Sequence, residues 1–225
     1  MMGSVKMLNQ IVLDADGGRF DLWGLSTVID SGADEPVVAR HEFDALHFAA
    51  GLTAEWPVGN AGLLHVYGYL LSAVHTPYGF KRDRWLDGSL ADALGKPSDY
   101  FSLERAEEED ETVLQRATDA VLPHLEEPDP DRFDILSMDD GVPDSDAFFR
   151  TTVLHDDLAD TAALAYGIHD GERMRVITVF PLADASTEAL DALVNESPRM
   201  HYNAVLPPLA PRSPLVRRAV RDLRD

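Results

Sequence analysis

AFFRTTVLHDDLADTAALAYGIHDGERMRVITVF, residues 147–180, carries the clearest β signal in the chain and decides the predicted fold class. Two apolar runs, 161–168 and 173–180, flank the sequence HDGE at 169–172. Its Asp-Gly pair predicts a type I′ hairpin turn, because Asp and Gly tolerate the positive φ that this turn requires. A third run, 147–154, predicts another strand before the hairpin. The region therefore predicts antiparallel β structure.

Turn signals on the N-terminal side of this region predict further strands. DADGG at 14–18 and TPYG at 76–79 are typical of turns that join two strands. The segment before the second turn, 61–74, is ambiguous: its length allows a helix, whereas its aromatic and branched residues favour a strand. We interpret it as a strand. The other predicted strands are 8–13, 19–29 and 80–86, with a short strand at 133–138 and an edge strand at 201–206.

Helical patterns separate these strands. At 36–50, Pro36 is a good helix start, and apolar residues then recur on one helical face. Runs of strands separated by runs of helix favour an α+β fold. We predict a largely antiparallel curved sheet of about seven strands, packed against three to five helices, with a pocket on its concave face. The other predicted helices are 89–95, 112–126, 187–197 and 215–225.

The domain organisation follows from length and proline content. A chain of 225 residues suits one large domain, and we assign residues 1–206 to a single α+β domain. PPLAPRSP at 207–214 predicts a stiff, proline-rich connector. The amphipathic C-terminal helix that follows is expected to pack on the acidic domain through Leu215, Ala219 and Leu223, with its arginines facing outward.

Composition excludes several classes of protein. The absence of Cys excludes disulfides, thiolate metal sites and cysteine nucleophiles, and it fits a reducing cytoplasm. No apolar run approaches the roughly 18 residues of a membrane span, and the N-terminus does not resemble a signal peptide. The formal net charge of −21 argues against nucleic acid as a partner, because phosphates would be repelled. We therefore predict a cytoplasmic protein without nucleic-acid or membrane partners.

No cofactor is predicted. The chain lacks a P-loop, G-x-G-x-x-G, G-x-S-x-G, H-E-x-x-H and an EF-hand loop. No metal ligands are assigned either. His41 and His47 are six residues apart on the predicted helix, so they point in different directions and cannot both bind one metal from that helix. A site of two His and one carboxylate from distant strands stays open.

HTPYGFKRDRW at 75–85 concentrates positive charge in an acidic chain. Strand alternation after the turn predicts Arg82 and Arg84 on one face and Lys81 on the other. Two guanidinium groups on one face can hold a carboxylate or a phosphate. The alternative is that these cations pair with the acidic region 86–146, where 19 acidic and four basic residues give a net charge of −15.

Histidine and tyrosine side chains accompany these cations. His65, Tyr67 and Tyr69 share one face of the predicted strand 61–74, so they could converge with the guanidinium groups and transfer protons. His155 precedes two Asp residues, which favour its cationic form, although it could equally lie in an ordinary polar turn. The predicted catalytic residues are His65, Tyr67, His75 and His155, and the predicted substrate-binding residues are Tyr78, Lys81, Arg82, Arg84, His201 and Tyr202.

Two functions are compatible with these patterns. The favoured one is a small cytoplasmic enzyme that acts on an anionic, carboxylated or phosphorylated small molecule by acid–base chemistry, as a lyase, cyclase, isomerase or hydrolase. Three Lys against sixteen Arg, with abundant Ala, Asp, Leu and Val, suggest a GC-rich bacterial genome, and a halophile is the alternative. Bacterial specialised metabolism is the setting considered for the enzyme. The alternative is a non-catalytic acidic interaction protein, such as an inhibitor, an immunity-type protein or a nucleic-acid mimic. A homodimer is the assembly considered for the enzyme.

Overall fold

The computed structural model describes residues 2–30, 32–77, 79–108, 110–127, 134–156, 161–186, 188–189, 192 and 203–205. Several predictions lie outside these residues: those for Tyr78, His201 and Tyr202, for the connector at 207–214 and the C-terminal helix, and for most of the helix at 187–197.

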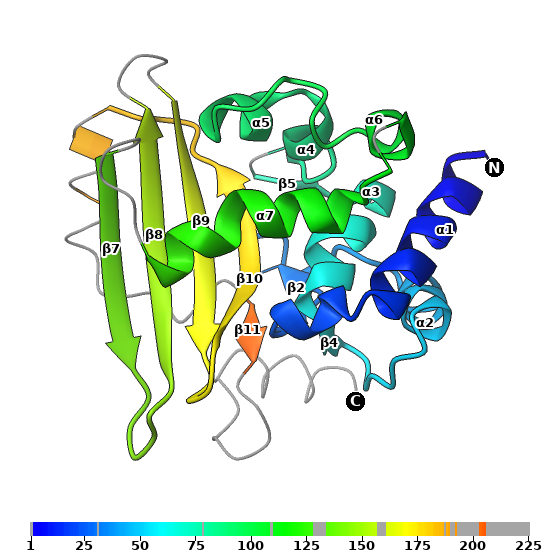
Figure 1. Ribbon diagram of the computed structural model, residues 1–225, viewed down its shortest axis with the longest axis horizontal. Coiled ribbons are helices and arrows are strands. Elements are labelled where there is room, and N and C mark those ends of the chain that lie inside the picture. Colours follow the sequence, from blue (N-terminus) through cyan, green and yellow to red (C-terminus); the bar gives the residue numbers. More distant parts are fainter. Residues whose placement is uncertain are drawn as a thin grey trace.

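A four-stranded antiparallel sheet forms one side of the molecule (Figure 1). Its strands have the spatial order β10-β9-β8-β7, so each strand pairs with its neighbour in the chain. The predicted strands at 147–154, 161–168 and 173–180 are confirmed, and the short strand predicted at 133–138 extends further than expected. The four strands are β7 (Asp134–Gly141), β8 (Phe148–Asp156), β9 (Thr161–His169) and β10 (Met174–Pro181).

The hairpin between β9 and β10 is confirmed, but its turn is not of type I′. His169 pairs with Met174, so four residues, 170–173, connect the strands. Among these four only Gly171 has a positive φ, of 97°, whereas a type I′ turn needs two such residues. The Asp170 carboxylate instead accepts hydrogen bonds from the backbone N–H groups of Glu172 and Arg173, at 3.0 and 3.1 Å.

Helix α7 (Val113–Glu126) crosses one face of this sheet (Figure 1). It confirms the helix predicted at 112–126. Thr112 caps its N-terminus, because the hydroxyl oxygen accepts a hydrogen bond from the Gln115 N–H at 3.0 Å. Each large apolar side chain that the helix buries contributes about 1.5–3 kcal/mol to stability. The buried apolar side chains of α7 are Val113, Leu114, Ala117, Ala120, Val121 and Leu125.

The close contact between α7 and β9 depends on Gly167, which leads to a prediction. A Cβ atom at this position would lie 2.9 Å from Leu125 Cδ1 and 2.9 Å from the Arg175 carbonyl oxygen. We expect Gly167→Ala to destabilise the fold by about 1–3 kcal/mol, because α7 would have to move off the sheet. Urea unfolding measures this loss. Gly141→Ala, with no atom within 4 Å of the added Cβ, is the matched control; equal losses in both variants would contradict the expectation.

A helix replaces the strand predicted at 8–13, and the strand predicted at 19–29 is confirmed only near its C-terminal end. The first segment lies within α1 (Met2–Asp16), and the second holds η1 (Arg19–Leu22), a 3₁₀ helix, before a short strand, β1 (Leu25–Thr27). The strand prediction at 8–13 was wrong because two of the four buried α1 residues are polar, which conceals the helical periodicity. These four are Met7, Gln10, Ile11 and Asp14.

The segment 61–74 is helical as well. It contains η2 (Leu63–Gly68), a π-helical turn, and α3 (Tyr69–Leu71). Every residue of η2 is buried, so the helix has no exposed side and no amphipathic period for the sequence to reveal. The strand predicted at 80–86 is also wrong: only Phe80 lies in a strand, and the chain then enters α4 (Asp83–Leu86).

Short strands complete the fold. β1 pairs with β4 and β11, β2 pairs with β3, and β5 pairs with β6. The described residues thus confirm an α+β fold, but they form several sheets rather than one curved seven-stranded sheet. The pairing of β11 confirms the strand predicted near 201–206. The bounds are β2 (Ile29–Asp30), β3 (Glu35–Pro36), β4 (Val58–Asn60), β5 (His75–Thr76), β6 (Gly79–Phe80) and β11 (Ala204–Val205).

Three more helices lie in the N-terminal half: α2 (Arg40–Ala49) and α6 (Leu103–Glu108) pack against α1, while α5 (Ser89–Ala93) packs against β9 and β10. α2 and α5 confirm the helices predicted at 36–50 and 89–95, while α6 was not predicted. One buried apolar cluster runs from α1 and η2 through α7 to β8, β9 and β10. Within the described part of the chain, none of the helices is both long and apolar enough to cross a bilayer.

Candidate functional site

Lys81 and Asp30 form a largely buried ion pair between two hairpins. The Lys81 ammonium lies 2.6 Å from Asp30 Oδ2 and donates a hydrogen bond to the Tyr69 hydroxyl at 3.3 Å. It also lies 4.6 Å from the centre of the Tyr69 ring, which is within cation–π range. The side chains of Lys81 and Asp30 remain 12% and 14% exposed. Solvent can therefore reach this ion pair.

His65 and Ser26 extend these contacts from Tyr69 into the core. The His65 ring packs edge-on against Tyr69, with ring centres 4.8 Å apart. Its Nε2 lies 2.7 Å from the Ser26 hydroxyl oxygen, which is itself 3.2 Å from the Thr27 carbonyl oxygen. These distances are satisfied together when His65 Nε2–H donates to Ser26 and Ser26 donates to Thr27. His65 Nδ1 is buried without a hydrogen-bond partner.

Five different elements bring these side chains together. Ser26 lies on β1, Asp30 ends β2, His65 lies in η2, Tyr69 starts α3 and Lys81 follows β6. The β2–β3 and β5–β6 hairpins meet near the ion pair: a Cβ atom on Gly32 would lie only 3.3 Å from Pro77 Cδ. The other Asp30 oxygen holds its own hairpin by accepting hydrogen bonds from the Gly32 and Ala33 N–H groups. We call Ser26, Asp30, His65, Tyr69 and Lys81 the relay cluster.

Burial and neighbouring charges set the protonation states of the relay cluster. Burial raises the pKa of Asp30, but the pairing with Lys81 and the backbone hydrogen bonds outweigh it, so the pKa falls below 3.8. Burial lowers the pKa of Lys81, but Tyr69 and Asp30 raise it above 10.5. Burial raises the pKa of Tyr69, although Lys81 opposes this. At neutral pH the cluster therefore holds a carboxylate, an ammonium and a neutral phenol.

His65 is held neutral. Burial, reinforced by the charge of Lys81, lowers its pKa to about 3. A neutral imidazole of such low basicity is a weak general base at pH 7, but it can orient Tyr69 and Ser26. The groups of the cluster suited to chemistry are thus Lys81, which can bind an anion, Tyr69 as a proton donor and Asp30, once it is released from Lys81, as a proton acceptor.

The depressed pKa of His65 predicts a pH dependence of stability. The unfolded chain takes up a proton on this residue as the pH falls through about 6.5, whereas the folded chain does not until about pH 3. His65 should therefore destabilise the fold by about 2 kcal/mol between pH 7 and pH 5. Urea unfolding of wild type and His65→Gln at both pH values measures this. His41→Gln, on the exposed side of α2, is the control and should lose as much unfolding free energy between pH 7 and pH 5 as wild type does. An equally large loss in His65→Gln would contradict the expectation.

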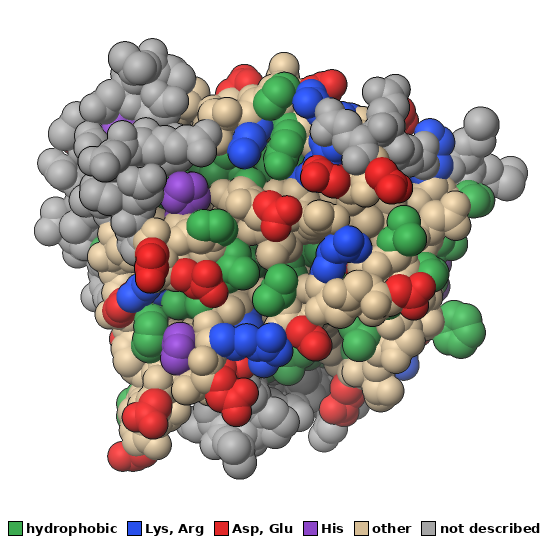
Figure 2. Space-filling view, in the orientation of Figure 1, with side chains coloured by type: hydrophobic (Ala, Val, Ile, Leu, Met, Phe, Trp, Pro, Cys, Tyr) green, Lys and Arg blue, Asp and Glu red, His purple; other side chains and the backbone are tan. Residues whose placement is uncertain are grey.

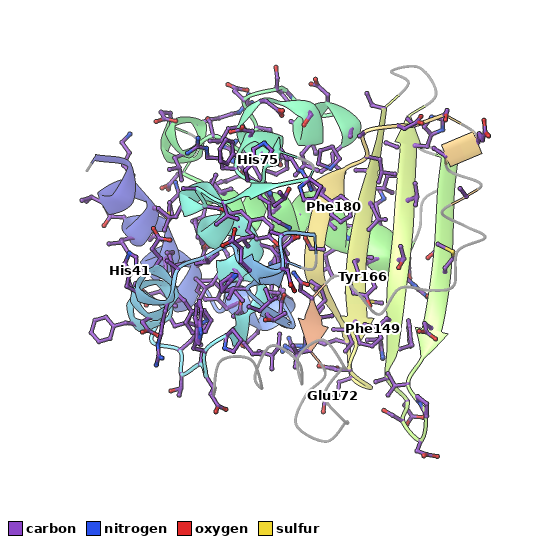
Figure 3. The ribbon with its side chains drawn as sticks, turned by 180° about the vertical axis from the view of Figure 1, so that it is seen from behind. His41, His75, Phe149, Tyr166, Glu172 and Phe180 are labelled. Carbon is purple, nitrogen blue, oxygen red and sulfur yellow. The ribbon has the colours of Figure 1, made fainter. Side chains whose placement is uncertain are left out.

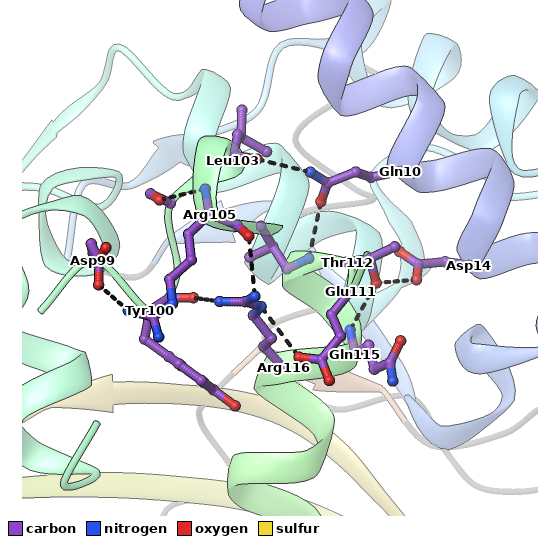
Figure 4. A network of polar contacts seen from close by, with 12 residues as sticks. Gln10, Asp14, Asp99, Tyr100, Leu103, Arg105, Glu111, Thr112, Gln115 and Arg116 are labelled. Atoms are coloured by element: carbon purple, nitrogen blue, oxygen red, sulfur yellow. Dashed lines mark hydrogen bonds and ion pairs between the residues drawn. The ribbon is translucent and has the colours of Figure 1, made fainter. Parts of the chain in front are cut away.

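Tyr67 belongs to a different buried network, around Asp14. Its hydroxyl donates to Asp14 Oδ2 at 2.5 Å, while Thr112 donates to Oδ1 and Arg19 lies 3.2 Å from the same oxygen. This network joins α1 to the N-terminus of α7 (Figure 4). Gln10 extends it by accepting the Val113 N–H at 2.9 Å. Tyr67 was predicted on the same face as His65; in η2 both are buried, but they take different partners.

Arg116 is a second buried centre beside that network (Figure 4). Its guanidinium donates to the carbonyl oxygens of Tyr100 and Arg105, at 3.0 and 3.2 Å, and it lies 3.5 Å from a Glu111 oxygen. These contacts tie the segment before α7 to the helix. They show that one basic residue of the acidic region 86–146 has its contacts within that same region.

Arg82, His75 and His155 do not belong to the relay cluster, whereas Arg84 lies near enough for its charge to oppose the raised pKa of Tyr69. Arg82 and Arg84 do not share a strand face, because the chain is helical there; Arg82 pairs with Asp83 at 3.3 Å. His75 is exposed at the start of β5 and packs edge-on against Phe80, 5.2 Å between ring centres (Figure 3). His155 lies on β8, opposite Ala162. The sequence predicted that His65 would meet Arg82 and Arg84, with Lys81 on the opposite face; in the structure Lys81 is the cation beside His65, and Tyr69 lies between them.

The two histidines of α2 lie in different environments. His41 is exposed (Figure 3), whereas His47 is buried and bonded through both ring nitrogens, to Phe43 and Asn60. No group of three or more His, Asp or Glu side chains with metal-binding geometry occurs among the residues that the structure describes.

Comparison with known proteins adds no family to this geometry. The chain matches no protein-family model, no curated protein and no solved structure. The sequence missed Ser26 and Asp30, since both lie within or beside a segment predicted as strand and no motif marks either one. Only their three-dimensional proximity to His65 and Lys81 identifies them.

Proposed function

We propose that the protein is a small enzyme that binds an anionic small molecule at Lys81 and transfers protons to and from it. One observation carries this proposal: a partly exposed ammonium group contacts both a carboxylate and a neutral phenol, 2.6 and 3.3 Å away. An ammonium binds carboxylate or phosphate, a phenol donates a proton, and a carboxylate accepts one. Such a set suits lyase, cyclase, isomerase or hydrolase chemistry.

The proposed binding step is an exchange of partners. The ligand's anionic group takes the place of Asp30 at Lys81, so the ammonium stays paired throughout. Tyr69 then donates its proton to the ligand, assisted by the positive charge beside its oxygen, and the released Asp30 carboxylate accepts a proton. The His65 ring, which is bonded to Ser26, packs against the Tyr69 ring with 4.8 Å between the ring centres and so keeps Tyr69 in place. In this proposal the protein works in a bacterial cytoplasm without an organic cofactor.

A thermal-shift screen tests the proposal. The probes are phosphate, glycerol phosphate, citrate, pyruvate and benzoate, each compared with chloride at the same ionic strength. A ligand present at about 100 times its Kd should raise the unfolding free energy by about 2.7 kcal/mol. At least one probe should raise the Tm beyond chloride. Equal Tm values in all these anions, with no response in larger anion panels, would contradict the proposal.

Exposed apolar side chains favour a second candidate, the acidic interaction protein. Phe48 on α2 is 88% exposed, and the outer side of the adjacent α1 exposes Val5, Leu8, Val12 and Leu13. The formal charge of −21 disfavours a second copy on this face and favours a basic protein partner. In this case Phe48→Ser should abolish a salt-sensitive complex in a pull-down with basic proteins, and the anion screen should show nothing. A complex that survives Phe48→Ser would contradict this candidate.

A further inference from the structure

A hollow of about 560 Å³ lies at one end of the four-stranded sheet, away from the relay cluster. Three side chains form its floor: Phe148, His169 and Met174. They come from β8, β9 and β10 and form a continuous row, because His169 pairs with Phe148 on one side and with Met174 on the other. The volume lies within the range of roughly 300–1,000 Å³ typical of small-molecule sites.

The carboxyl end of α7 forms the wall of the hollow. Pro123, Glu126 and Glu127 line it from the helix side, and Arg150 lies at the edge of the floor. Figure 2 views the molecule from the side that α7 covers, where acidic side chains lie among apolar ones over the sheet. On the opposite face of the sheet, Phe149 and Tyr166 stack on each other at 5.6 Å (Figure 3).

The floor presents ring edges rather than a ring face. The rings of Phe148 and His169 stack on each other, with an interplanar angle of 5° and centres 4.9 Å apart, so each covers one face of the other. The Arg150 guanidinium lies 5.2 Å from the centre of the Phe148 ring. A planar ligand can lie across the two ring edges in an edge-to-face contact, and the Met174 thioether supplies a soft apolar contact beside it.

The charge around the hollow is negative, because Arg150 is already neutralised. Its Nε and Nη2 each donate to the Asp139 carboxylate at 2.7 Å, and its Nη1 donates to the Leu125 carbonyl oxygen at 2.8 Å. Glu126 and Glu127 add two exposed carboxylates. The carboxyl end of a helix further favours positive charge. Among the described residues that line the hollow, the only guanidinium is thus already paired with a carboxylate, whereas a cation finds two carboxylates.

We propose that this hollow binds a small, flat organic cation, such as an aromatic ring that carries an amidinium or ammonium group. The ligand ring lies across the edges of the Phe148 and His169 rings and against Met174, and the positive group lies against Glu126 and Glu127. This site is separate from the anion site proposed at Lys81 and does not depend on it.

Benzamidine, which is cationic at neutral pH, is the probe. The readout is the ¹³C-methyl resonance of Met174, identified with Met174→Leu. Benzamidine should shift this resonance in a saturable way, while benzoate, which has the same ring and the opposite charge, should not. A response to benzoate as large as that to benzamidine, or no response to benzamidine at solubility-limited concentrations, would overturn the proposal.

A charge-matched pair of variants locates the contact. Glu126→Gln combined with Glu127→Gln should weaken benzamidine binding about tenfold, because two partly screened attractions are lost. Glu55→Gln combined with Glu104→Gln removes the same charge from exposed positions elsewhere and should weaken binding less than about twofold. Equal weakening in both double variants would show a general charge effect and overturn the assignment of the site.

Discussion

We expect Asp14→Ala to destabilise the protein by roughly 3–5 kcal/mol, a loss matched among the substitutions considered only by that of Lys81→Met. The carboxylate is fully buried and accepts hydrogen bonds from Tyr67, Thr112 and Arg19. Alanine would leave all three donors without their acceptor, and only Arg19, whose side chain is 30% exposed, could turn to water instead. It would also weaken the cap of α7, because Thr112 is both the cap and a donor to Asp14.

The measurement is urea or thermal unfolding, with Asp14→Asn as the conservative control. For a chain of this length the expected loss corresponds to a fall in Tm of roughly 6–20 °C. Burial raises the pKa of Asp14 despite its hydrogen bonds, so a neutral amide of the same shape should recover much of the stability. A Tm within about 2 °C of wild type for Asp14→Ala would show that the network around Asp14 contributes little.

We expect the double variant Lys81→Met with Asp30→Asn to fold normally and to lose anion binding. The single variant Lys81→Met is less informative, because it leaves an unpaired, mostly buried Asp30 and should cost about 3–5 kcal/mol. Removing both charges avoids that cost, and the amide oxygen that Asp30→Asn introduces can still accept the Gly32 and Ala33 N–H groups. The unfolding free energy should then stay within about 1–2 kcal/mol of wild type.

The binding readout separates this prediction from a loss of folding. Whichever probe raises the Tm of wild type should bind the double variant at least about thirtyfold more weakly, because a charge-assisted contact worth about 2 kcal/mol or more is lost. Lys81→Arg keeps the positive charge and should retain part of the affinity. Undiminished binding to a well-folded double variant would place the anion elsewhere.

The C-terminal sheet was predictable because its strands are local in sequence and bounded by turn residues. The segments 147–154, 161–168 and 173–180 became β8, β9 and β10, and the helix at 112–126 became α7. The turn at 169–172 joined the predicted strands but not with the predicted geometry. A carboxylate that binds two backbone N–H groups stabilised a four-residue connection instead.

The N-terminal half was not predictable by the same rules. Buried Gln10 and Asp14 made the inner face of α1 half polar, and the fully buried η2 showed no amphipathic period. Both features come from tertiary contacts, such as the Tyr67–Asp14 hydrogen bond between residues 53 positions apart. The candidate site depends on tertiary contacts in the same way. The local concentration of cations and of His and Tyr side chains pointed to His65 and Lys81, but Ser26 and Asp30 reach them only through the packing of β1, β2 and η2.

The central claim, that Lys81 binds an anionic small molecule, is tested most directly by the lysine resonances of the protein itself. The chain has only three lysines, Lys6, Lys81 and Lys96, so ¹³Cε-labelled lysine gives three signals, and Lys81→Arg identifies one of them. Titration with phosphate, glycerol phosphate, citrate, pyruvate and benzoate follows. We predict a saturable shift of the Lys81 signal with at least one anion, while Lys6 and Lys96 stay in place. A Lys81 signal that moves no further than the other two in every titration would contradict the account.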